Sequence, residues 1–325
     1  MAINPSEFKT RTPLDSVSFK LINDAVDMIA DRVFTPVYTD QKDIFSVYQY
    51  DQRHLRSIVG KSSSKAEANR VDHGAFKKDR TTTLYKLKTD LDPRDSNTFD
   101  AAVADIRTDG AETIWSHLMI EREIAAMTLA TTAANYPAAL TQSLTDGTTT
   151  LTSSGGDIEG IARTAHAAIR TACGKSANAA AMSKTGFEAL CQAPSVVDRI
   201  KYVNGTKAKE EQIANLLGVQ ELVIGGGIYN TALEGATATN SDIWPDDLLF
   251  FVKNPSVSKR TMRYGAWYVR NELYTHEAPD PKRGSGDGRI QELEMGWEWL
   301  LAPGAVVSSS DDDFIAGYLV KNIIG

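Results

Sequence analysis

The sequence predicts an α+β fold, on three observations. One long helical pattern runs from about Glu112 to Asn135, between the D-x-x-E start signal at Asp109 and the stop at Pro137. Short helices alternating with apolar strands follow it, and the last third of the chain is rich in strands joined by turns. The 325 residues are 42% hydrophobic and 24% charged, which is the balance of a globular protein.

The N-terminal region predicts an extended arm. Residues 1–20 are polar and mixed, with Pro5 and Pro13 and no sustained period. Apolar residues then recur at helical spacing from Leu21 to Ile29, which predicts a short helix that Pro36 ends.

A long polar segment separates the next two predicted strands, Ile44–Tyr50 and Arg80–Thr89. So long a polar connection is uncommon in a compact protein unless it has a function. We therefore expect the two strands to pair and to carry a projecting two-stranded flap. We call residues 51–80 the basic flap.

The basic flap differs in charge from the rest of the chain. It holds four acidic and eight basic residues, a balance of +4 in a chain of net −7. The basic residues are Arg53, Arg56, Lys61, Lys65, Arg70, Lys77, Lys78 and Arg80. A basic flap on an acidic body suits contact between subunits, so these residues are the candidate inter-subunit contacts. The alternative is a charged loop that is simply solvated.

The long helix has one apolar face. At about 1.5 Å per residue it would be roughly 35 Å long. We expect Leu118 and Leu129 to face strands of the same domain. The residues predicted on this face are Ile114, Leu118, Ala125, Leu129 and Ala133.

The remaining elements follow from the same patterns. Asp146 and Gly147 predict the turn of a hairpin over Thr141–Leu151. The predicted helices are Ile158–Cys173, Lys184–Gln192 and Glu210–Leu217. The predicted strands are Ala179–Met182, Glu221–Ile224, Leu248–Val252, Tyr264–Leu273, Arg289–Leu301 and Phe314–Ile324.

The sequence offers no catalytic, cofactor or metal site. Its five histidines do not stand at metal-ligand spacing. The run Gly225–Gly227 follows a strand but lacks the Lys-Ser/Thr of a nucleotide loop, so a tight turn is the better interpretation. Cys173 and Cys191 lie in apolar surroundings and are expected to be buried thiols.

Composition also excludes several classes of protein. The net charge of −7 argues against a sequence-reading nucleic-acid binder, which needs a basic surplus. No apolar run is long enough to cross a bilayer, so no membrane partner is expected. The stretch Met1–Pro5 lacks the features of a signal peptide, so we expect the protein to be made and used in a cytoplasm.

Several short stretches of this sequence form an ordered set that spans roughly residues 19–322. They are Phe19–Val37 with its Ala-Asp-Arg-Val-Phe core, Ser195–Tyr202, Gln212–Val219, Glu221–Gly225, Tyr229–Ala232, Ile243–Trp244, Leu248–Val252, Lys282–Gly288 and Gly317–Asn322. In this order they resemble a large family of tailed-bacteriophage major capsid proteins. The sequence departs from the family at Gly225–Gly227 and is only loosely similar in the basic flap.

The resemblance implies a Hong Kong 97-type fold and a division of the chain. The implied parts are an N-terminal arm (1–40), an extended loop (41–92), a peripheral domain (93–154, with a spine helix at 109–136), an axial domain (155–260) and C-terminal strands of the peripheral domain (261–325). It also implies a shell subunit rather than an enzyme, forming hexamers and pentamers around double-stranded DNA.

The resemblance implies partners as well. They are other copies of the chain, a separate scaffolding protein, a portal protein at one vertex and DNA held without sequence-specific contacts, and a decoration protein is compatible. Assembly would take place in the cytoplasm of a host bacterium, and the product would be the virion capsid. The alternatives are an encapsulin-like nanocompartment and a soluble α/β enzyme that uses the Gly225 turn.

Overall fold

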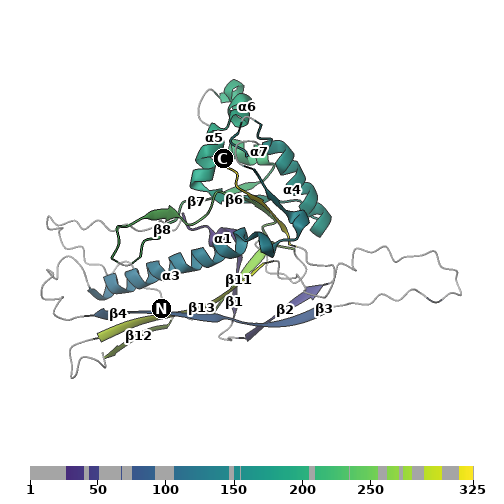
Figure 1. The fold of residues 1–325 in the computed structure, drawn as a ribbon. Coiled ribbons are helices and arrows are strands. Elements are labelled where there is room, and N and C mark those ends of the chain that lie inside the picture. The colour runs from purple at the N-terminus through teal and green to yellow at the C-terminus, as the bar shows by residue number, and fades with distance from the viewer. Residues whose placement is uncertain are drawn as a thin grey trace. The chain divides into compact units, whose positions relative to one another are not determined.

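The structure, a computed structural model, is shown in Figure 1. It describes residues 27–39, 44–50, 67, 75–91, 106–145, 150–153, 155–204, 209–233, 235–254, 262–270, 274–279, 289–301 and 315–324. The chain divides into two compact units. The first comprises Met1–Asn23, Leu84–Glu121 and Glu272–Met295, and the second comprises Asp24–Thr83, Arg122–Asn271 and Gly296–Gly325.

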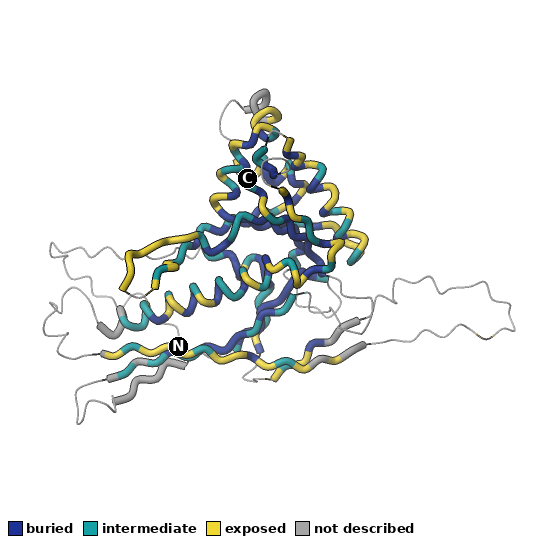
Figure 2. Tube along the Cα trace, viewed as in Figure 1, coloured by how far each residue is buried: buried dark blue, intermediate teal, exposed yellow. Residues whose placement is uncertain are grey.

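The second unit contains a five-stranded sheet in the order β5-β14-β10-β6-β7. Its strands are β5 (Thr141–Ser143), β14 (Gly317–Lys321), β10 (Leu248–Phe251), β6 (Ala179–Ser183) and β7 (Glu221–Gly225). Every residue of β6 and β10 is buried, which explains their apolar sequences, interrupted only by Ser183 at the end of β6. Figure 2 shows much of this sheet in the buried colour.

Four helices accompany this sheet. They are α4 (Ile158–Cys173), α5 (Lys184–Gln192), α6 (Pro194–Asn204) and α7 (Glu210–Leu217). Helix α4 contacts β10, β14 and α7, while α5 contacts β6 and β7. Asp157 and Ser183 cap α4 and α5 by accepting hydrogen bonds from backbone N–H groups, and Gly174 ends α4 in the left-handed conformation. These local signals place α4, α5 and α7 at the bounds predicted from the sequence.

A second sheet combines strands from distant parts of the chain. In the second unit, β1 (Thr35–Thr39) pairs in parallel with β11 (Gly265–Arg270), and β11 pairs antiparallel with residues 297–301 of β13 (Arg289–Leu301). In the first unit, β12 (Tyr274–Pro279) pairs with residues 289–294 of β13, and β4 (Thr83–Leu91) also pairs with β13.

The long helix α3 (Ile106–Thr131) is about 39 Å long at its ordinary rise, and a turn of 3-10 helix, Ala133–Asn135, follows it. It begins earlier than predicted. No proline interrupts it from Ile106 onward, and Asp109 lies in its first turn, where acidic side chains are favourable. The boundary between the units falls within α3, after Glu121, and within β13, after Met295.

The buried face of α3 follows the prediction only in its first half. Ile114 and Leu118 are buried as expected, but Ala125 and Leu129 are half-buried. Further along, the buried positions are Met119, Arg122, Glu123, Ala126, Ala130 and Thr131. The prediction failed there because it assumed that charged residues lie outside the core. Arg122 and Glu123 are buried because they have partners within it.

The strand pairing predicted for the flap is wrong in one respect. Strand β2 (Ile44–Tyr50) has the predicted bounds, but it pairs with β3 (Ala75–Thr81). The predicted strand Arg80–Thr89 is therefore split between β3 and β4 near Thr82, and β4 pairs with β13 instead. Periodicity finds strands but does not identify their partners, because pairing depends on distant residues.

The predicted hairpin at Thr141–Leu151 is also wrong. Strand β5 pairs in parallel with β14, and the Leu151 N–H donates to the carbonyl of Ile323, so both arms bond to the C-terminal segment. Several elements were not predicted: β1, α6, β12 and the pair β8 (Ile228–Asn230) and β9 (Asn240–Asp242). In β1, Pro36 is tolerated because the strand has β11 as its one neighbour in the described sheet.

Candidate inter-subunit surface and its anchor

The β2–β3 hairpin carries the described part of the predicted inter-subunit surface. Its register pairs Ile44 with Thr81 and Tyr50 with Ala75. It packs on the β1-β11-β13 sheet of the second unit through Val47, Ala266 and Tyr268. The ring of Phe45 stacks on that of Tyr268 with centroids 4.1 Å apart. The base of the hairpin is therefore fixed by apolar contacts to the body.

The opposite face of the hairpin is exposed and carries Ser46, Lys77 and Asp79 beside the apolar Ile44. Asp79 accepts a hydrogen bond from Ser46 at 2.6 Å and forms an ion pair with Lys77 at 3.2 Å. The hydrogen bond from Ser46, followed by that from Lys77, lowers the pKa of Asp79. The bond between Ser46 and Asp79 links the two strands, whereas Lys77 and Asp79 lie on the same strand.

The structure locates only part of the predicted contact set. Lys77 is exposed on β3 and Arg80 is half-buried at its end. The side chain of Lys78 lies outside the described residues, although its place in β3, opposite Val47, is described. The other predicted residues also lie outside the described part of the chain: Arg53, Arg56, Lys61, Lys65 and Arg70.

A buried carboxylate that the sequence analysis missed anchors residues 27–39, which we call the N-terminal segment. Glu123 of α3 is fully buried. It accepts hydrogen bonds from the backbone N–H groups of Ile29, at 2.7 Å, and Ala30, at 3.0 Å, and from the indole N–H of Trp244 at 2.7 Å. It thus caps the one-turn helix α1 (Ala30–Val33), which has no side-chain cap of its own.

Burial raises the pKa of Glu123, because loss of solvent outweighs the hydrogen bonds from Trp244, Ile29 and Ala30 and the nearby charge of Arg122. Arg122 in turn makes an ion pair with Asp31 at 3.0 Å. Its guanidinium also lies 4.6 Å from the ring centroid of Trp267.

The run Gly225–Gly227 completes the anchor. The N–H groups of Gly226 and Gly227 both donate to the carbonyl of Asp27, at 3.1 and 3.2 Å. None of the three glycines has a left-handed backbone, so their small size is what is required. A Cβ on Gly225 would lie 2.8 Å from Trp244, and one on Gly226 would lie 2.5 Å from Asp27. The predicted turn therefore binds the N-terminal segment through the backbone at Asp27.

Apolar side chains secure the same segment beyond the anchor. Ile29 and Phe34 are fully buried. The Phe34 ring lies 5.5 Å from that of Tyr264 and 5.0 Å from that of Trp299. Residues 30–34, Ala-Asp-Arg-Val-Phe, therefore attach the N-terminal segment to the rest of the second unit.

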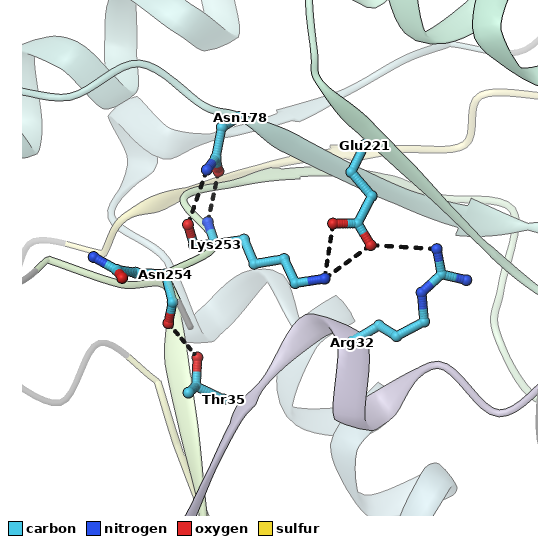
Figure 3. Close-up of polar contacts among 6 residues, drawn as sticks. All are labelled: Arg32, Thr35, Asn178, Glu221, Lys253 and Asn254. Carbon is cyan, nitrogen blue, oxygen red and sulfur yellow. Dashed lines mark hydrogen bonds and ion pairs between the residues drawn. The ribbon is translucent and has the colours of Figure 1, made fainter. Parts of the chain in front are cut away.

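A cluster of charged residues ties α1 to the five-stranded sheet (Figure 3). Glu221 accepts from Lys253 at 2.7 and 2.8 Å and from Arg32 at 3.3 Å. Partial burial favours a higher pKa for Glu221, but the hydrogen bonds and charge of Lys253, with those of Arg32, bring it below its ordinary value. Asn178 holds the backbone of Lys253 through both its amide oxygen and its amide nitrogen.

Other kinds of site are not found in the described part of the chain. No three His, Cys, Asp or Glu side chains among the described residues come together in a way that could hold a metal ion. The described helices include none that is long and apolar enough to span a membrane. Neither Cys173 nor Cys191 forms a disulfide, and both are half-buried rather than buried as expected.

A scan against protein-family models finds no match, and a search of curated proteins finds no relative. Solved structures do match over nearly the whole chain. A phage-related protein from Bordetella bronchiseptica RB50 aligns with a TM-score of 0.67 at 18% identity, covering 93% of this chain and 94% of that one. The capsid protein of Cyanophage P-SCSP1u aligns with a TM-score of 0.60 at 12% identity, covering 98% and 94%.

The capsid protein of Myoviridae phage XM1 aligns with a TM-score of 0.55 at 11% identity, covering 98% of both chains. This chain has the Hong Kong 97-type fold of phage capsid proteins. The predicted fold class and the resemblance in fold are thereby confirmed. Within this capsid fold, α3 is the long helix and the β2–β3 hairpin is the root of the basic flap.

Proposed function

We propose that this chain is the major capsid protein of a tailed bacteriophage, a structural subunit that assembles with copies of itself into an icosahedral shell around double-stranded DNA. The observation that carries the proposal is the agreement in fold with phage capsid proteins from end to end of both chains. A shared fold alone does not define a function, but capsid proteins act by the surfaces of the whole fold rather than by a grafted site.

The charge of the chain supports the same role. A container for DNA must not adhere to its cargo, and a chain of net −7 repels phosphate groups. The positive charge is concentrated in the basic flap, whose root is fixed to the body by Phe45 and Val47. A flap held at its base can lie across the acidic surface of a neighbouring subunit.

The finer features remain part of the proposal. Copies form hexamers and pentamers, with residues 155–260 near the local symmetry axis and the segment 41–92 reaching the neighbour. A separate scaffolding protein directs assembly and a portal protein occupies one vertex. No catalysis is required for this role.

Size-exclusion chromatography of the purified chain, alone and with its scaffolding protein, tests the proposal. The expected result is elution as capsomers or large particles, and the particles from infected cells should contain DNA. Elution only as a monomer or small oligomer under all these conditions would refute self-assembly. Particles filled with protein instead of DNA would indicate an encapsulin-like nanocompartment.

A further inference from the structure

The β8–β9 hairpin leaves the second unit from a rigid root. It is a two-stranded sheet with Ile228 opposite Asp242 and Asn230 opposite Asn240. At its root the Ile243 N–H donates to the carbonyl of Gly227 at 2.8 Å. Ile243 and the adjoining Trp244 are buried, and Trp244 is bonded to Glu123. The hairpin therefore starts from the anchor described above.

Hydrogen bonds also fix the tip of the hairpin. The side-chain oxygen of Asn230 accepts from the N–H groups of Ala232 and Thr239, both at 3.0 Å. The Thr231 N–H donates to the carbonyl of Thr239 at 2.9 Å. The tip therefore has one preferred conformation without the help of a hydrophobic core.

The described residues at the tip of this hairpin are not covered by the described part of the same subunit. Its described residues from 230 to 241 are exposed except Ala232, as Figure 2 shows in yellow. At the tip, Leu233 is 85% exposed, more than Tyr38 and Ile44, which are each 64% exposed. A two-stranded hairpin without a hydrophobic core is only marginally stable in water. Packing of the tip against another molecule would therefore stabilise it.

We propose that the β8–β9 hairpin is an inter-subunit contact, in which Leu233 inserts as an apolar anchor into a second copy of this chain. The inference rests on the proposed self-assembly. Single exposed leucines are common on protein surfaces. This one differs because it is presented on a preorganised tip, as the anchor residues of protein interfaces are.

The charge of the tip favours a second copy as the occupant. Glu234 is the one charged residue between Asn230 and Ser241, in a chain that is 24% charged. Copies that each carry −7 repel one another except where their surfaces lack charge. The tip has no basic residue with which to bind nucleic acid. The centres of protein interfaces are likewise depleted of charged residues.

The test compares assembly of the full chain with that of three variants, followed by light scattering and negative-stain microscopy. Leu233→Ser removes the anchor without adding charge. Leu233→Met keeps an apolar side chain, and Thr237→Ser changes another exposed residue of the same tip. We expect Leu233→Ser to raise the subunit concentration needed for assembly about 30-fold, the effect of losing one strong anchor. The other two variants should assemble like the wild type, and all should unfold at the same temperature.

A photo-crosslinking amino acid at position 233 identifies the occupant directly. We expect a covalent dimer of this chain in assembled particles and none in isolated subunits. Wild-type shells together with normal assembly of Leu233→Ser would overturn the hairpin proposal and leave the proposed function intact. Crosslinking only to a scaffolding or decoration protein would also overturn it. A wild-type chain that forms no shell would refute the proposed function itself.

Discussion

The buried carboxylate of Glu123 gives the sharpest test of how the N-terminal segment is attached. Glu123→Ala removes the acceptor of three buried donors: the N–H groups of Ile29 and Ala30 and the indole of Trp244. An unsatisfied buried donor costs about 1–3 kcal/mol. Because the variant no longer buries a charge, part of this loss of stability is offset. We expect the free energy of unfolding to fall by about 3 kcal/mol.

Two further variants separate the hydrogen bonds from other effects. Glu123→Gln keeps the oxygen that accepts from Ile29, Ala30 and Trp244. It places an amide donor at the second oxygen, which lies 3.1 Å from the Ala30 nitrogen. Its loss should be intermediate, about 1 kcal/mol. Glu121→Ala changes an exposed carboxylate on the same helix and should alter stability by less than about 0.5 kcal/mol.

Urea unfolding of unassembled subunits, followed by tryptophan fluorescence and circular dichroism, measures all three. If Glu123→Ala unfolds at the same urea concentration as Glu121→Ala, then Glu123 does not anchor the N-terminal segment. The order expected is Glu121→Ala, then Glu123→Gln, then Glu123→Ala, from the most to the least stable.

Three further predictions concern pH, the long helix and the basic flap. Because the pKa of Glu123 is raised in the folded state, folded protein holds more protons than unfolded protein between the ordinary and the raised values. The stability of wild type relative to Glu123→Gln should therefore rise as pH falls through this window, and a fall would contradict the assignment. Leu118 is 5% exposed, so Leu118→Asp should cost about 3 kcal/mol or more, and soluble, normally assembling Leu118→Asp protein would contradict its place in the core. Charge reversal to Glu at four flap positions changes the flap from +4 to −4 and should block assembly at low salt, with partial recovery as salt screens repulsion over about 8–10 Å; normal shells at low salt would show that the flap is not an electrostatic contact. These positions are Arg53, Arg56, Lys77 and Lys78.

Local signals in the sequence were sufficient for much of the fold. Helices α4, α5 and α7 and strand β13 have the predicted bounds, because caps, left-handed glycines and unbroken periodicity define them within a few residues. The partner of β2 and the pairing of β5 could not be predicted, since each depends on residues far away in the sequence.

The anchor was missed for a similar reason. Arg122 and Glu123 interrupt the apolar face of α3. From the sequence alone, charged residues at such positions are expected to face solvent. They are buried because Asp31, Trp267 and the N–H groups of the N-terminal segment meet them from other elements. The one local signal was the position of Arg122. Residues 122, 126 and 130 continue the four-residue spacing of the buried residues 114 and 118.

The most direct test of the central claim is a cryo-electron-microscopy reconstruction of particles assembled from this chain. We expect an icosahedral shell of hexamers and pentamers, with the basic flap of each subunit lying on its neighbour. A discrete oligomer of a few subunits, with no closed shell in the presence of the scaffolding protein, would contradict it.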